Sequence, residues 1–112
     1  MKTVKFLLDE RISDLFDNYN LCATLFKAVS AHEEEDKKYY NLLLSYLKSS
    51  KEFIFKLKEV KNEFKGLSNE LQGLEKALLR NFKVNSLDEI LEYLEKEEIE
   101  TTKKIKAGVG NE

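Results

Sequence analysis

The chain of 112 residues contains no proline and no tryptophan, and it has only four glycines, one cysteine and one histidine. Because so few residues favour tight turns, the composition argues against a fold of many short strands. The single cysteine, Cys22, rules out an internal disulfide and is typical of a reducing compartment. Charge is abundant instead: 36% of the residues are Asp, Glu, Lys or Arg, which together with frequent leucine predicts long α-helices.

The formal net charge of −2 gives the surface no general attraction for phosphate, and only Arg11 and Arg80 among the nineteen cationic residues are arginine. Both facts argue against a nucleic-acid partner. No apolar run approaches the roughly 20 residues of a membrane span. Acidic residues from Asp9 onward interrupt the apolar positions near the N-terminus, so we expect no signal peptide and a cytoplasmic protein.

The first segment places apolar residues at alternating spacings of four and three, which predicts an amphipathic helix over about 3–29. Phe16, Ala23 and Leu25 widen this stripe. A polar run over 30–38 follows and predicts a chain reversal near residue 30, with Ser30 and Glu33 at capping-box spacing. One unbroken helix with a solvated waist is the alternative. The stripe consists of Leu8, Ile12, Leu15, Tyr19, Cys22, Phe26 and Val29.

A second heptad pattern runs from Tyr39 to Leu78, and Ser50 is its one polar position. The common register predicts one long central helix of about 33–81. Gly66 and Gly73 each cost a helix about 1 kcal/mol relative to alanine, so a break near Gly66 that gives a monomeric four-helix bundle is the alternative.

The last helix is predicted at about 87–104, because Ser86 and Glu89 have capping-box spacing and an apolar face follows them. Residues 107–112 read as a disordered tail. The chain is therefore expected to form one helical domain over 1–106.

These elements predict an all-α fold, an antiparallel helical hairpin in which a long central helix is flanked by a shorter helix at each end. One such hairpin leaves apolar residues of the central helix uncovered, so we expect a homodimer with a four-helix cross-section. The predicted interface is Tyr40, Leu44, Leu47, Ile54, Leu67 and Leu71.

Charge is segregated along the chain. Residues 37–65 carry eight Lys and three Glu, whereas residues 84–100 carry seven acidic residues and only Lys96 as a cation. Opposite charges favour docking of the last helix beside the lysine-rich stretch, within one chain or between two. The alternative is that both stretches are solvated faces.

Two functional hypotheses follow. The first is a small protein-protein interaction module, such as an adaptor, assembly subunit or chaperone, that binds itself or another helical protein through its apolar heptad stripe and needs no cofactor. The second is a carboxylate-rich metal binder or metal-dependent hydrolase that uses His32, Glu35 and Asp36 or the acidic residues of the last helix. A non-enzymatic role is favoured, because Cys22 is distant in sequence from the only histidine and no glycine-rich phosphate loop is present.

Overall fold

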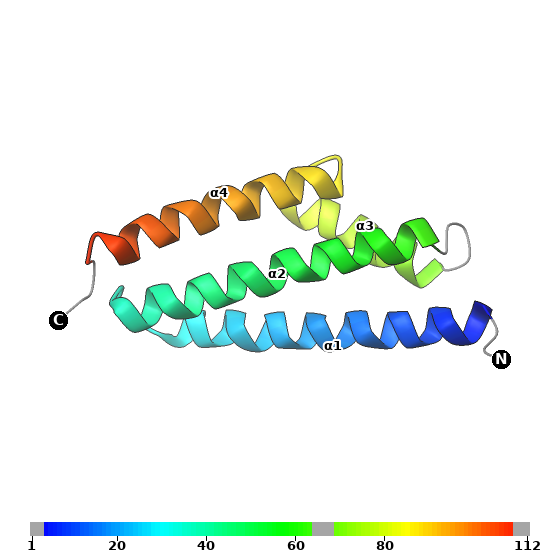
Figure 1. The fold of residues 1–112 in the computed structure, drawn as a ribbon, viewed down its shortest axis with the longest axis horizontal. Coiled ribbons are helices and arrows are strands. Elements are labelled where there is room, and N and C mark those ends of the chain that lie inside the picture. Colours follow the sequence, from blue (N-terminus) through cyan, green and yellow to red (C-terminus); the bar gives the residue numbers. More distant parts are fainter. Residues whose placement is uncertain (1–3, 64–68, 109–112) are drawn as a thin grey trace.

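The computed structural model describes residues 4–63 and 69–108, and over these residues the protein is a bundle of four α-helices. They are α1 (Val4–Ala31), α2 (Lys37–Glu63), α3 (Asn69–Phe82) and α4 (Leu87–Lys106). Figure 1 shows α2 in the middle, with α1 along one side and α4 along the other. The prediction of an all-α fold is confirmed.

The first reversal lies at residues 32–36, close to the predicted position, but its cap is different. Ser30 lies inside α1, so the predicted Ser30–Glu33 cap is wrong. Asp36 caps α2 instead: its Oδ1 accepts the backbone N–H of Tyr39 at 2.9 Å. A carboxylate at this position satisfies a donor of the first helical turn and lies at the positive end of the helix dipole.

The predicted continuous helix over 33–81 is wrong. Helix α2 ends at Glu63, and α3 runs back in the opposite direction (Figure 1). The reversal is favourable because it brings Leu71, which is 6% exposed, and the neighbouring Leu74 onto the same apolar core that α2 contacts. The break itself, with Gly66, lies outside the described residues. The arrangement matches the alternative of a four-helix bundle within one chain.

The last helix begins where the sequence predicts. The Ser86 side chain accepts the backbone N–H of Glu89 at 3.3 Å, and the Glu89 carboxylate accepts the N–H of Asn85 at 3.2 Å. The preceding turn places Lys83 at a φ of 57°. Val84 N–H then bonds the carbonyl of Leu79 at 3.1 Å, which closes the C-terminus of α3 in a Schellman arrangement.

The core lies along α2, between α1 and α4. Leu57 and Ile90 are both 0% exposed. The remaining members are also apolar, with no buried charge among them. The core consists of Ile12, Leu15, Leu47, Phe53, Ile54, Leu57, Val60, Leu71, Leu87, Ile90 and Leu94.

This core changes the status of the predicted dimer interface. Tyr40, Leu47, Ile54 and Leu71 are buried within one chain, at 2% to 6% exposure, and Leu44 is half-buried. The expectation that the central helix lacks cover was wrong, because both α1 and α4 pack on α2. Contact of these side chains with another chain would require the bundle to open. The sixth predicted residue, Leu67, lies outside the described residues.

Candidate functional site

The acidic corner between α1 and α2 brings together two of the three predicted metal ligands. His32 Nε2 lies 2.8 Å from Asp36 Oδ1, whereas the Glu35 carboxylate accepts the Tyr40 hydroxyl at 3.2 Å. The N–H of Tyr39 and the hydrogen bond with His32 hold the pKa of Asp36 below its ordinary value.

The carboxylate that a metal ion would need is therefore already used in hydrogen bonds that hold this turn. The His32 ring also stacks on Tyr39, with centroids 6.3 Å apart. Within residues 4–63 and 69–108, no group of three or more His, Cys, Asp or Glu side chains is arranged to hold a metal ion.

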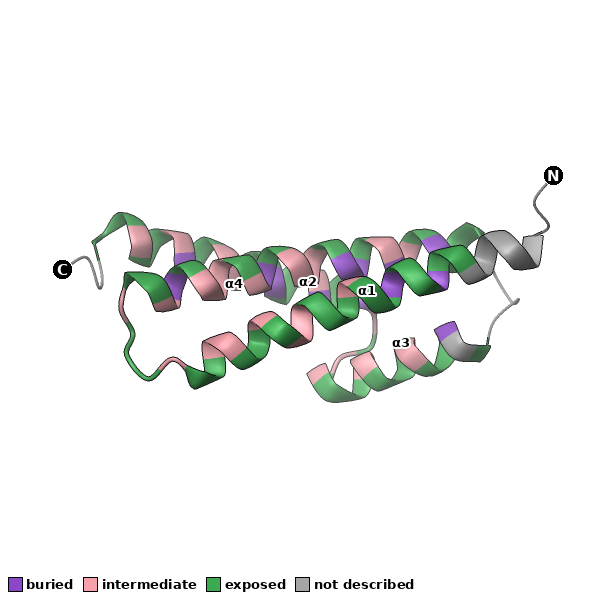
Figure 2. Cartoon of the chain, turned by 90° about the horizontal axis from the view of Figure 1, so that it is seen from below, coloured by how far each residue is buried: buried purple, intermediate pink, exposed green. Residues whose placement is uncertain are grey.

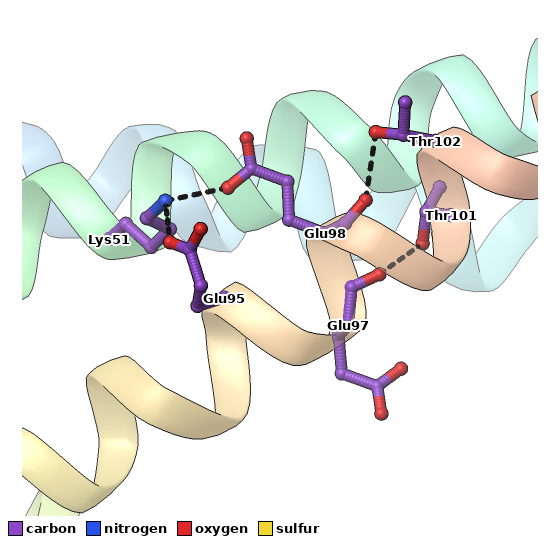
Figure 3. A network of polar contacts seen from close by, with 6 residues as sticks. All are labelled: Lys51, Glu95, Glu97, Glu98, Thr101 and Thr102. Atoms are coloured by element: carbon purple, nitrogen blue, oxygen red, sulfur yellow. Dashed lines mark hydrogen bonds and ion pairs between the residues drawn. The ribbon is translucent and has the colours of Figure 1, made fainter.

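The contact between α2 and α4 is held by ion pairs (Figure 3). Lys51 Nζ lies 2.5 Å from a carboxylate oxygen of Glu95 and 2.7 Å from one of Glu98, and Lys58 pairs with Asp88. The two carboxylates raise the pKa of Lys51. The predicted docking of the acidic helix beside the lysine-rich stretch is confirmed in its intrachain form.

An apolar groove of about 590 Å³ lies between α1 and α3, and we call it the α1–α3 groove. Helix α1 forms one wall, the C-terminal end of α3 forms the other, and Tyr46 of α2 lies between them. Its lining residues are Tyr19, Cys22, Ala23, Phe26, Lys27, Tyr46, Leu78, Asn81 and Phe82.

Partly exposed aromatic side chains dominate this groove. Phe26 is 54% exposed although its ring centroid lies 5.7 Å from that of Tyr46. Tyr19 is 46% exposed although its ring centroid lies 6.1 Å from that of Phe53. Large aromatic side chains that stay half-exposed beside a packed partner present area that another protein can bury.

A small part of the groove, beside Tyr46, is polar. Burial raises the pKa of the Cys22 thiol and of the Tyr46 phenol, and hydrogen bonds with Ser50 partly offset both increases. These bonds account for Ser50 as the one polar position of the heptad pattern. The Glu52 carboxylate adds to the increase at Cys22, so the thiol is protonated at neutral pH.

Lys27 is the only charged residue that lines the groove, and no salt bridge to it is found among the described residues. Five cations elsewhere in the bundle pair with a carboxylate of another helix, and Lys104 of α4 lies over the Tyr40 ring of α2. These pairs are Arg11–Glu63, Lys51 with Glu95 and Glu98, Lys56–Asp14, Lys58–Asp88 and Lys61–Glu75.

The apolar stripe in the sequence identified the helix that forms this site, but it did not show which side of that helix would stay exposed. Tyr19, Cys22 and Phe26 belong to the stripe predicted for residues 3–29, yet two of these three are about half exposed. The signal was the extra width that Phe16 and Ala23 give the stripe, because one neighbouring helix cannot cover so wide an apolar face.

Comparison with known proteins adds no relative: no family model, no curated protein and no solved structure matches the chain. Over the described residues, no helix is both long and apolar enough to cross a membrane.

Proposed function

We propose that this chain is a small protein-protein interaction module that binds a helix of its partner in the α1–α3 groove. The observation that carries the proposal is the half-exposed aromatic lining, above all Phe26 and Tyr19. Aromatic residues are enriched at the centres of protein interfaces, where they contribute much of the binding energy. Tyr93 of α4, which is 51% exposed and lies 5.9 Å from Phe82, extends the same surface.

The spacing along α1 suits a helical partner. Phe16, Tyr19, Ala23 and Phe26 follow one another at intervals of three, four and three, the spacing of a coiled-coil seam. The small side chain of Ala23 leaves a recess between larger neighbours, into which a knob of a second helix can fit. An apolar helix in such a groove is a common mode of peptide recognition.

A homodimer, which the sequence predicts, is the form of this proposal in which a second chain supplies the helix. Sedimentation equilibrium from about 1 to 100 μM separates the forms: a concentration-dependent dimer that Phe26→Glu abolishes identifies the second chain as the partner, and a constant monomer mass assigns the groove to another protein.

A matched pair of substitutions on α1 tests the binding surface. Phe26→Glu places a charge in the groove, and Leu21→Glu places the same charge on the same helix at a side chain that is 49% exposed and does not line the groove. In affinity capture followed by reconstitution with the purified partner, the wild-type chain and Leu21→Glu should bind, and Phe26→Glu should weaken binding at least about tenfold. Equal binding by both variants would refute the proposal.

A further inference from the structure

We infer that the helix bound in the α1–α3 groove is amphipathic and acidic, with Glu or Asp beside its apolar seam, and that it completes the half of the bundle that α3 leaves open. This inference rests on the proposed function and names the chemistry of the partner.

The first observation is the length of α3. It has 14 residues against 28 in α1, about 21 Å against about 42 Å. Figure 2 shows α1 continuing past the end of α3. The groove lies at that end, since Leu78, Asn81 and Phe82 are its lining residues from α3. A partner helix in line with α3 would cover the part of α1 that α3 does not reach.

The second observation is charge. The stretches 18–31 and 76–83, which include the lining residues of α1 and α3, contain four cations and no Asp or Glu. Lys27 lies in the groove itself, and none of the four has a salt bridge among the described residues. Since the bundle's own helices contact one another through Lys–carboxylate pairs, a carboxylate on the incoming helix would give Lys27 the partner it lacks. The four cations are Lys27, Lys76, Arg80 and Lys83.

The lining and the charge of the groove also favour a protein over a nucleic acid as the partner. The groove is lined by a single cation and mostly by apolar side chains, whereas binding of single-stranded nucleic acid requires a track of cations along the phosphates. One apolar seam with one adjacent cation is instead the pattern that an amphipathic helix complements.

The test uses the full chain and two stapled helical peptides of equal length. Both carry leucine at the seam positions, and the flanking positions are Glu in one and Lys in the other. Affinity is measured by fluorescence anisotropy. Alkylation of Cys22 by N-ethylmaleimide reports occupancy of the groove, because Cys22 is the only cysteine and lines it.

The Glu peptide should bind about tenfold more tightly than the Lys peptide and should slow alkylation of Cys22. Lys27→Glu should abolish or reverse this preference. Lys76→Glu is the control, since it makes the same charge change at an exposed residue that does not line the groove, and it should keep most of the preference.

Each of the other possible outcomes would overturn a defined part of the inference or of the proposed function. Equal affinity for both peptides, with Cys22 protected, would refute the acidic partner and leave the proposed function intact. Binding of neither peptide would refute both. Protection of Cys22 by an oligothymidylate would replace the protein partner with a nucleic acid. Protection that grows with protein concentration alone would make a second copy the occupant.

Discussion

Two sides of the same bundle have opposite character. Where α4 packs on α2, Leu57, Ile90 and Leu94 are buried, and Lys51 and Lys58 meet carboxylates of the neighbouring helix. In the α1–α3 groove, Phe26 remains half-exposed and Lys27 has no salt bridge to any described residue. The contact between α2 and α4 buries apolar side chains and pairs opposite charges, which stabilises the fold. In the groove, apolar area and a charge remain exposed to solvent. We therefore expect the groove to contribute little to folding, and the proposed function assigns it to binding.

The largest predicted difference between the two sides is in the free energy of unfolding. Leu57→Ala removes a side chain that is 0% exposed, so it should cost about 3 kcal/mol. Phe26→Ala, at 54% exposure, should cost less than about 1 kcal/mol. Urea denaturation of both variants measures the contrast. Similar losses for the two would show that the groove is part of the stabilising core.

A smaller effect is expected at the ion pairs. Lys51→Met should lower the free energy of unfolding by about 1 kcal/mol near pH 7, because it leaves Glu95 and Glu98 without their shared cation. Lys48→Met is the matched control, since Lys48 is exposed and makes no polar contact within the described structure.

The pH dependence of this effect has a defined sign. The pKa of Lys51 is raised in the folded state, so the stabilisation is fully present below the ordinary value of 10.5 and is lost as the pH rises through the folded pKa. The difference between wild type and Lys51→Met should therefore persist at pH 9 and shrink above pH 10.5. A difference that does not change with pH would mean that packing, rather than charge, explains the loss.

The smallest effect concerns the groove thiol. Burial holds the pKa of Cys22 above its ordinary value of 9.0, so the rate of alkylation should reach half its maximum above pH 9.0. Ser50→Ala removes the hydrogen bond that favours the thiolate and should move the midpoint further upward. A midpoint below 9.0 would contradict the described environment of Cys22.

Much of the helical content could be predicted from the sequence, since helix ends depend on local chemistry. Ser86 and Glu89 occupy the predicted capping positions, and α4 begins at Leu87 as expected. Ser30 has the same local signature but lies inside α1, because the chain has a second candidate cap six residues later, in Asp36. Spacing alone does not rank two competing caps.

The reversal between α2 and α3 could not be read from the heptad register. Leu71 and Leu74 keep the phase of Leu57 and Val60 because all four contact the same core, whether the chain continues or folds back. The expectation of an uncovered central helix came from the same limit, because a helix without a break would have left its apolar residues exposed. The groove was missed likewise, since its second wall belongs to α3.

The most direct test of the proposed groove is an NMR titration of the isotope-labelled chain with the Glu peptide, because it reports both sides of the bundle at once. We predict shifts of the backbone amides of residues 19–27 and 78–82, with little change around Lys51 and Glu98. Shifts confined to the α2–α4 contact, or spread uniformly over the chain, would contradict the assignment of binding to the α1–α3 groove.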